Sequence, residues 1–373
     1  MEVLDSGWLT TGLKAKQFET DFAAFVGVPH AVAVNSATAA LHLALEALGV
    51  TAGDEVIVPT WTFAATAGVV IHLGATPVLI DIDPASLNLT VAGVRAAVTP
   101  RTKAVMAVHI AGRPAPIEAL VEAMEPLDIA VVEDAAHAFP SRIGASGRMA
   151  GTVGLIGAYS FYATKTITTG EGGMLVSDDE SLAARARLMS LHGIGRDAWK
   201  RYQAGGSWFY EIEAAGYKYN LSDLAAALGL VQLSRAEELL AARRELVGWY
   251  REVFATSAAS DLIGLPDDER DGSHAWHLYI VRLHLESLML DRAAVIARLG
   301  ELGIGASVHF IPLHLHPYYQ RLGWSPGDLP EAAAQYERVV SLPLWPGMTR
   351  DDVERVVTAL TGILAGARRK GVA

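Results

Sequence analysis

Residues 157–177 read GAYSFYATKTITTGEGGMLVS, a stretch in which two apolar segments enclose a polar loop. The segments Gly157–Phe161 and Gly173–Ser177 have the length and composition of buried strands. The loop between them contains four threonines and two glycines around a single lysine, Lys165. Polar groups that follow a buried strand lie at the sheet edge where α/β proteins bind ligands. The stretch therefore predicts an α/β fold with Lys165 at its functional edge.

Working outward, short β-branched runs alternate with Ala- and Leu-rich helical stretches from about residue 20 to residue 235. This order builds a sheet of parallel strands with helices on its faces. Helical spacing of apolar residues predicts helices at Ala37–Leu48 and Pro116–Met124. Five further strands are predicted, at Ala31–Asn35, Glu55–Pro59, Thr76–Ile82, Ala104–Ile110 and Ile129–Asp134. Together with Gly157–Phe161 and Gly173–Ser177 they make seven strands of one large α/β domain.

A long helix-forming stretch, Leu224–Ala255, is predicted to connect this domain to a second one. The second domain would contain a strand at His277–Leu283 and helices at Asp291–Leu302 and Arg350–Arg368. No repeat or low-complexity linker separates the two parts, so we expect them to be packed together rather than tethered. We predict a large domain over residues 1–235 and a smaller C-terminal α/β domain over residues 236–373.

Composition excludes several protein classes. The 373 residues are 51% hydrophobic and 19% charged, against about 25% charged residues in ordinary domains. Disordered and coiled-coil chains need many charges and few buried apolar groups, so both are excluded. The excess of apolar residues indicates that a partner chain covers part of the surface.

Charge and cysteine content narrow the chemistry. The formal net charge is −11, which argues against nucleic acid or an anionic membrane as the main partner, because both are bound by clustered Lys and Arg. The absence of Cys excludes disulfides, thiolate zinc sites, iron–sulfur clusters and Cys nucleophiles.

Targeting and membrane segments are not predicted. The most apolar stretch, Phe63–Ile80, is interrupted by His72, Gly74 and Pro77, so it is not predicted to span a membrane. The N-terminal sequence MEVLDSGWLTTG lacks a basic region followed by an apolar one. We expect a soluble, cytoplasmic enzyme.

Asp134 ends an apolar strand in the segment VVEDAAHA. A carboxylate at this edge could bind a protonated ring nitrogen of a cofactor and keep it cationic. Capping of a following helix is the competing interpretation, because Asp is a common N-cap residue.

Lys165 is flanked by Ser160, Thr164 and Thr166 rather than by other charges. In a confined site, burial and neighbouring cations lower the pKa of a lysine amine, which makes it a Schiff-base nucleophile and proton carrier. A solvated surface lysine is the alternative.

Two further segments follow predicted strands. In VAVNSATAALHLALEAL, the free N–H groups of Ala37, Thr38 and Ala39 at a helix start would form an anion site, or serve only in ordinary helix capping. In VPTWTFAATAG, Trp61 and Phe63 would stack on a planar ring or lie in the core.

Three histidines occur close together in HFIPLHLHPYY, namely His309, His314 and His316. Their side-chain type and spacing would suit a metal, which gives a His-metal hydrolase as a competing function. No Asp or Glu in the segment completes a ligand set.

Taken in order, the motifs resemble the DegT/DnrJ/StrS family of sugar-nucleotide aminotransferases. The resemblance runs from GWLTTG at Gly7 to SLPLWPGMT ending at Thr349, and GYKYNLSD at residues 216–223 resembles the branch that makes 4-amino-4-deoxy-arabinose. The motifs that carry it are SATAALHLAL, VPTWTFAATA, LIDIDPASLNL, EDAAHA, SFYATKTITTGEGGM, GYKYNLSDLAAALGLVQL and HFIPLHLHPYY.

The resemblance implies the PLP-dependent transferase fold of type I, with a mixed, mostly parallel seven-stranded sheet, and pyridoxal 5′-phosphate (PLP) as cofactor. It implies that Lys165 is the Schiff-base lysine and that Asp134 binds the pyridinium nitrogen. His137 would lie beside the cofactor's 3-oxygen, and Phe63 would cover the ring. The phosphate would be held by Ala37, Thr38, Ser160 and, from the neighbouring subunit of a homodimer, Asn220. The predicted substrate-binding residues are Thr10, Trp61, His309 and His314.

The implied reaction moves an amino group from glutamate, or another amine donor, to a ketone, most simply C4 of a nucleotide-linked keto-deoxy sugar. A cyclitol, or simple amines and ketones, are alternative substrates within the same chemistry, and a non-catalytic relative is a third hypothesis. Trp208, Phe209 and Tyr210 would stack on the sugar nucleotide's base, line an apolar substrate pocket or belong to the core of a dimer interface.

The chain departs from the family pattern at several positions. Ala37 stands where relatives have Gly, so the phosphate turn must have a negative φ there. His137 replaces the usual Gln, and whether it donates or accepts depends on its protonation. Arg113 replaces another Gln, and the lead-in before GWLTTG is short.

Overall fold

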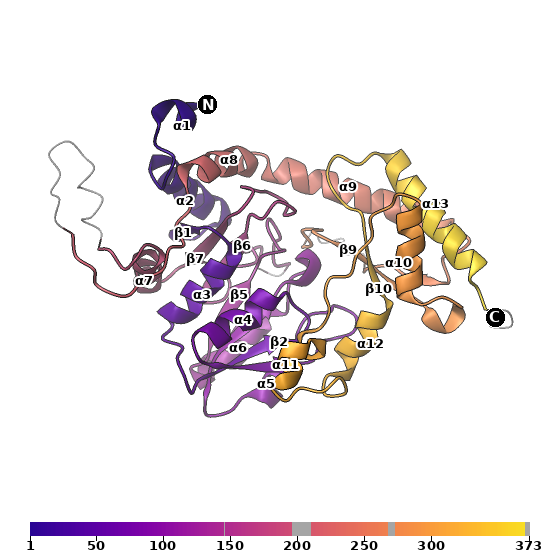
Figure 1. Cartoon of the computed structure of the whole chain (residues 1–373), viewed down its shortest axis with the longest axis horizontal. Coiled ribbons are helices and arrows are strands. Elements are labelled where there is room, and N and C mark those ends of the chain that lie inside the picture. The colour runs from indigo at the N-terminus through magenta and orange to yellow at the C-terminus, as the bar shows by residue number, and fades with distance from the viewer. Residues whose placement is uncertain (145, 196–209, 268–272, 370–373) are drawn as a thin grey trace.

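The computed structural model describes residues 1–144, 146–195, 210–267 and 273–369. Its centre is a seven-stranded sheet whose strands all coincide with predicted ones to within two residues (Figure 1). In spatial order the strands are β1 (His30–Val34), β7 (Gly173–Ser177), β6 (Ile156–Ser160), β5 (Ala130–Asp134), β4 (Thr102–Val108), β2 (Glu55–Pro59) and β3 (Thr76–Ile80). Only β7 runs antiparallel to its neighbours, so the sheet is mixed and mostly parallel, as predicted.

Side chains of each strand alternate between two hydrophobic clusters, one on each face of the sheet. In β1, for example, Ala31 and Ala33 belong to one cluster and Val32 and Val34 to the other. This two-residue period, with both faces apolar, is what a sheet covered by helices on both sides requires.

Helices cover both faces of this sheet. One face packs against α2 (Leu13–Val26), α5 (Val91–Ala97), α6 (Ile117–Met124) and α8 (Asp223–Leu233). The other packs against α3 (Ala37–Ala47), α4 (Ala64–His72) and α7 (Glu180–Ser190). A short α1 (Glu2–Ser6) contacts α8.

The predicted connector Leu224–Ala255 is two helices, not one. Helix α8 ends at Leu233, and α9 begins at Ala236 and ends at Ala255. The break follows from local hydrogen bonds: the Ser234 hydroxyl donates to the carbonyl of Val231, and the Arg235 N–H donates to the carbonyl of Gln232. These bonds tighten the last turn and end the helix.

From α8, α9 leads to a second, smaller layer of structure (Figure 1). A three-stranded sheet, in the order β10 (Val339–Leu342), β9 (Tyr279–Leu283) and β8 (Ile263–Gly264), packs there with α9, α10 (Arg292–Glu301) and α13 (Arg350–Gly366) around a third hydrophobic cluster. The strand and two helices predicted for this part are present, whereas the short strands β8 and β10 were not predicted.

The segment between α10 and β10 returns to the large sheet. Its helices, α11 (Pro317–Arg321) and α12 (Pro330–Arg338), are joined to it by a cluster that contains Leu313, Tyr319 and Leu329. Asp81, just beyond β3, accepts the N–H groups of the first residues of α12 at 2.8 and 2.9 Å. The two parts are thus packed together, and the boundary after residue 235 remains a prediction. Among the described helices, none is long and apolar enough to cross a membrane.

Candidate active site

One cavity of about 550 Å³ gathers most of the predicted site residues at the carboxyl ends of β5 and β6. Strand pairing places these ends side by side, because Asp134 pairs with Ala158 and Ser160 pairs with Gly173. Eight predicted residues line the cavity: Ala37, Thr38, Phe63, Asp134, His137, Ser160, Lys165 and His309. Thr62, Tyr162, Thr164, Glu171, His277 and Phe310 also line it and were not predicted as site residues.

Lys165 lies in the loop after β6, where its N–H donates to the carbonyl of Tyr162 at 2.9 Å. Burial lowers the pKa of its amine from 10.5 to about 8, and the negative charge of Asp134 opposes this shift. At this pKa about a tenth of the amine is neutral at pH 7, and the neutral amine is the form that attacks a carbonyl. The interpretation of Lys165 as a solvated surface lysine is wrong.

Asp134 ends β5 inside the cavity and is 5% exposed. Its Oδ2 accepts the Thr66 hydroxyl at 2.8 Å, and its Oδ1 accepts the N–H of Ala136 at 3.2 Å. Burial raises the pKa of this carboxyl, while those hydrogen bonds and Lys165 oppose the rise. No helix begins after Asp134 in this described part of the chain, so the helix-capping interpretation is wrong. A nearby cation would stabilise the charged form of this buried carboxylate, and the cavity has room for such a partner.

Directly behind Asp134, Glu133 anchors the end of β5. Its fully buried carboxylate accepts the N–H groups of Gly151, Val153 and Gly154 at 2.6–2.7 Å and the Nε2–H of His109 at 2.8 Å. Burial raises the pKa of Glu133, but the bonds from His109 and the backbone outweigh it and leave the pKa below its usual value. The sequence shows two adjacent carboxylates, Glu133 and Asp134, at the end of a predicted strand. It does not show the hydrogen-bond partners of Glu133, which are 18 to 24 residues away along the chain.

The start of α3 forms another wall of the cavity. Ser36 caps this 11-residue helix by accepting the N–H of Ala39 at 3.1 Å, while the N–H groups of Ala37 and Thr38 have no partner among the described residues. Ala37 has no positive φ, as expected for a residue with a Cβ at a position where relatives have Gly. Gly173 of β7 is required beside this turn, since a Cβ there would lie 2.6 Å from the Ala37 nitrogen. Unpartnered N–H groups at a helix start bind anions such as phosphate.

His137 is buried beside the cavity, and its Nδ1 accepts the N–H of Ala111 at 3.3 Å. Ala111 has the left-handed φ of 59° that turns its N–H toward the ring. Burial and the charge of Lys165 lower the pKa of His137 well below its usual value. The ring is therefore neutral with its proton on Nε2, so His137 is a donor toward the cavity.

Phe63 is 60% exposed at the mouth of the cavity and precedes α4. Its ring centroid lies 5.8 Å from that of Phe310, which in turn lies 5.6 Å from that of His137. An exposed aromatic ring beside a lysine and a carboxylate is suited to cover a planar group.

Four predicted residues lie outside the cavity. Trp61 is fully buried, and its indole N–H donates to the carbonyl of His309 at 3.1 Å. His314 is also buried and bonds Thr60 at 2.8 Å. Thr10 is exposed near α8, and Asn220 bonds the Thr11 hydroxyl at 2.5 Å. Trp61 and His314 support the cavity wall from behind, and their predicted substrate contacts remain predictions.

The three histidines of the HFIPLHLHPYY segment do not converge. His309 bonds the Ser341 hydroxyl and His314 bonds Thr60, on different sides of the segment. Within the described ranges, no group of three His, Asp or Glu residues could hold a metal ion. Trp208 and Phe209 lie outside the described residues, and Tyr210 is exposed.

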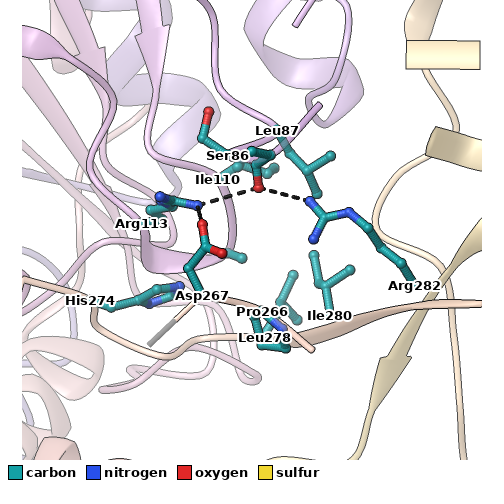
Figure 2. Close-up of a pocket in the computed structure, with 12 residues that line it drawn as sticks. Ser86, Leu87, Ile110, Arg113, Pro266, Asp267, His274, Leu278, Ile280 and Arg282 are labelled. Carbon is teal, nitrogen blue, oxygen red and sulfur yellow. Dashed lines mark hydrogen bonds and ion pairs between the residues drawn. The ribbon is translucent and has the colours of Figure 1, made fainter. Parts of the chain in front are cut away.

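Arg113 lies outside the cavity, in a small pocket of about 30 Å³ between the two parts of the chain (Figure 2). It pairs with Asp267 at 2.9 Å and donates to the carbonyl of Ala85, which also accepts from Arg282 of β9. Both guanidinium groups therefore join the loop after β3 to the C-terminal part.

The chain is similar to known proteins over nearly its whole length. The model of the DegT/DnrJ/EryC1/StrS aminotransferase family matches residues 1–361. The chain is 49% identical over 370 residues to the spore coat polysaccharide biosynthesis protein SpsC of Bacillus subtilis, which covers 98% of this chain and 93% of that protein.

Two solved structures are also similar over nearly the whole chain. The putative sugar aminotransferase Spr1654 of Streptococcus pneumoniae, in its PMP form, has a TM-score of 0.90 at 34% identity and covers 98% of this chain and 95% of its own; its PLP form has a TM-score of 0.89. DesI, solved with its TDP-sugar product, has a TM-score of 0.85 at 36% identity, and the match covers 97% of this chain and 88% of the DesI chain.

Proposed function

Because this chain belongs to the DegT/DnrJ/EryC1/StrS aminotransferase family, we propose that it moves the amino group of L-glutamate to C4 of a nucleotide-linked keto-deoxy sugar. The chain is a PLP-dependent aminotransferase of fold type I. The observation that carries the proposal is that one cavity is lined by both the Lys165 amine, whose pKa is lowered, and the Asp134 carboxylate.

The cavity fits PLP at both ends. Asp134 would hold the ring nitrogen and Lys165 the aldehyde carbon, with Phe63 over the ring and the His137 Nε2–H at the 3-oxygen. The phosphate would be held by the free N–H groups of Ala37 and Thr38 and by the hydroxyls of Thr38 and Ser160. When bound, PLP supplies an aldehyde that accepts the amino group and a ring that withdraws electrons from the reacting carbon.

Lys165 would move the proton. With the cofactor bound and the Lys165 amine free, its neutral Nζ would take the proton from the α-carbon of the amino donor and would later give that proton back at a neighbouring carbon. A pKa of about 8 suits a group that must gain and lose a proton near neutral pH. Asp134 would keep the ring nitrogen protonated throughout, since its carboxylate is stabilised by Thr66 and Ala136.

A homodimer would complete the phosphate site. Asn220 lies outside the cavity of its own chain, beside Thr11 and Lys218. This position is compatible with a contact to the cofactor of a neighbouring subunit. The exposed apolar side chains of α8, namely Leu224, Leu228 and Val231, support a subunit contact nearby. Mixing Lys165→Ala and Asn220→Ala subunits tests this, because half of the sites in the mixed dimer regain both residues. If mixing restores no PLP affinity over the Asn220→Ala protein, the shared site is refuted.

Substrate class rests on the relatives. DesI was solved with a TDP-sugar product and SpsC carries the name of a polysaccharide biosynthesis protein, which supports a nucleotide-linked sugar and a cytoplasmic role in polysaccharide synthesis. His309, which lines the cavity, is the proposed contact to the acceptor. A cyclitol, or simple amines and ketones, would require the same chemistry.

Separate half-reactions test the substrates. The purified PLP enzyme is mixed with glutamate or with small primary amines, and the loss of its cofactor absorbance is followed; the aminated enzyme is then mixed with 4-keto sugar nucleotides, keto-cyclitols or simple ketones. We expect fast conversion by glutamate and by the sugar nucleotides. Faster conversion by simple amines and ketones would establish the alternative.

A further inference from the structure

His277 reaches the cavity from the C-terminal part of the chain, just before β9, and has no role in the scheme above. It lines the same cavity as Lys165 and Asp134 and is 7% exposed. Its ring centroid lies 4.5 Å from that of His137. A neutral buried imidazole has no packing advantage over a phenyl ring, so its nitrogens require an explanation.

The backbone of His277 is firmly held. The buried guanidinium of Arg243, on α9, donates to the carbonyls of Trp276 at 3.0 Å and His277 at 3.3 Å. On either side of His277, the N–H groups of Ala275 and Leu278 donate to the turn at residues 111–112. Gly112 permits this approach, since a Cβ there would lie 3.1 Å from the His277 nitrogen. The turn that presents an N–H to His137 therefore also fixes His277.

The proton of His277 can be assigned. Burial, then the positive charge of Lys165, lowers the pKa of this ring well below its usual value, so it carries one proton. Nδ1 is buried without a hydrogen-bond partner in the described part of the chain. An orphaned buried N–H is rarer in proteins than an unfilled acceptor, so the proton is on Nε2. No described residue accepts a hydrogen bond from Nε2 either, which leaves a donor for a ligand.

The lining of the cavity contains no arginine among the described residues. Its cation is Lys165, which is used by the reaction, and its remaining donors are hydroxyls, backbone N–H groups and the imidazoles of His137, His277 and His309. An amino acid that reacts at Lys165 brings an α-carboxylate within a bond of the reacting carbon. Neutral N–H groups bind such an anion well in a confined site.

We propose that His277 is a substrate-binding residue, which donates its Nε2–H to the α-carboxylate of the amino donor. The proposal rests on the proposed function for the identity of the donor. It explains why a histidine, whose Nε2–H has no acceptor within the described chain, is held beside His137 by three separate backbone contacts.

Three replacements of His277 separate its nitrogens from its shape. His277→Phe keeps a ring and removes both nitrogens, His277→Gln places an amide N–H near the position of Nε2, and His277→Asn places one near Nδ1. Each variant is loaded with PLP, and the rate of the glutamate half-reaction is measured against glutamate concentration. The ketone half-reaction and the dissociation constant of PLP are measured in parallel. His274→Phe is the control for disturbance of this segment, because His274 is equally buried but does not line the cavity. It removes the acceptor of the Trp276 N–H, so it disturbs the segment more than His277→Phe does.

We expect His277→Phe to weaken apparent glutamate binding by about tenfold or more, as for loss of a hydrogen bond to a charged group. Gln should restore most of that loss and Asn should not, while PLP affinity, the ketone half-reaction and the His274→Phe control change by less than about threefold. Unchanged glutamate binding in His277→Phe, rescue by Asn alone, or a loss confined to PLP affinity or to the ketone step would overturn the proposal.

A non-reacting probe separates this proposal from the proposed function. Glutarate, which has carboxylates but no amine, is titrated into the PLP enzyme and its binding is followed by calorimetry. If glutamate fails to aminate the wild-type enzyme, the proposed function fails. The carboxylate site then stands if glutarate binds and His277→Phe weakens it, and falls if glutarate binds both proteins equally or neither.

Discussion

The two walls of the cavity are built in opposite ways. The wall from the large sheet carries Asp134 at a strand end and Lys165 in the loop after β6, and the carboxylates of Glu133 and Asp134 are hydrogen-bonded within the chain. The wall from the C-terminal part carries His277, His309 and Phe310 on irregular segments, and His277 has nitrogens with no partner there. The first wall thus carries the groups that we propose to hold the cofactor, and the second leaves donors for a substrate.

The largest effect should come from the first wall. Lys165→Ala removes the proposed nucleophile and proton carrier, so we expect turnover to fall by about 10³-fold or more and the lysine-dependent absorbance of bound PLP to disappear. The unfolding temperature should be little changed, since the amine has no hydrogen-bond partner to lose among the described residues. A variant that keeps both absorbance and turnover would remove Lys165 from the reaction.

The next largest effect tests the hydrogen bonds of the first wall. Glu133→Ala leaves the N–H groups of Gly151, Val153 and Gly154 and the ring of His109 without their acceptor. We expect the free energy of unfolding, measured with denaturant, to fall by about 3 kcal/mol or more. Glu133→Gln, which keeps one acceptor oxygen, should lose less. Equal stability of all three proteins would show that these bonds do not anchor β5.

Protonation of Lys165 offers a smaller effect with a definite sign. The neutral amine captures the aldehyde, so the rate at which the PLP-free protein binds PLP should rise with pH through about 8 and level off above it. In Asp134→Asn the midpoint should move to lower pH, because the charge of Asp134 raises the pKa of Lys165. A midpoint near the ordinary lysine value of 10.5, or a shift upward in the variant, would contradict this account of the first wall.

The smallest effect belongs to the second wall. His277→Phe loses no hydrogen bond of its side chain within the described chain, so its free energy of unfolding should change by less than about 1 kcal/mol. This contrast with Glu133→Ala is the sharpest expression of the difference between the walls. Destabilisation of His277→Phe as large as that of Glu133→Ala would show that His277 is structural.

The same contrast explains what could be predicted from the sequence. The seven strands of the large sheet follow from short apolar runs, and Asp134, Ser160 and Lys165 follow from polar groups at or just beyond the ends of those runs. His277 and Phe310 depend on contacts between segments more than 130 residues apart, which no local pattern contains. Thr66, which binds Asp134, could have been predicted as a site residue, because it lies four residues after Thr62 in the sequence, about one helical turn. In the structure Thr62 lies just before α4, Thr66 lies in its first turn, and the two hydroxyls bond each other at 2.6 Å.

One prediction and one competing interpretation failed for the same physical reason. Leu224–Ala255 has helical periodicity throughout, but side-chain and backbone bonds at Ser234 and Arg235 end one helix before the next begins. Asp134 has the residue type of a helix cap, but the chain turns after Ala136 without a helix. In both cases local hydrogen bonding overrode propensity, and only the structure reveals it.

Transfer of labelled nitrogen tests the central claim most directly. The enzyme is incubated with PLP, ¹⁵N-glutamate and a TDP-linked 4-keto-6-deoxy sugar, and the sugar nucleotide is analysed by mass spectrometry and NMR. The account predicts a product one amino group richer, with ¹⁵N bonded to C4 and one 2-oxoglutarate formed per sugar. An unaltered sugar nucleotide, or ¹⁵N on a different carbon, would contradict it.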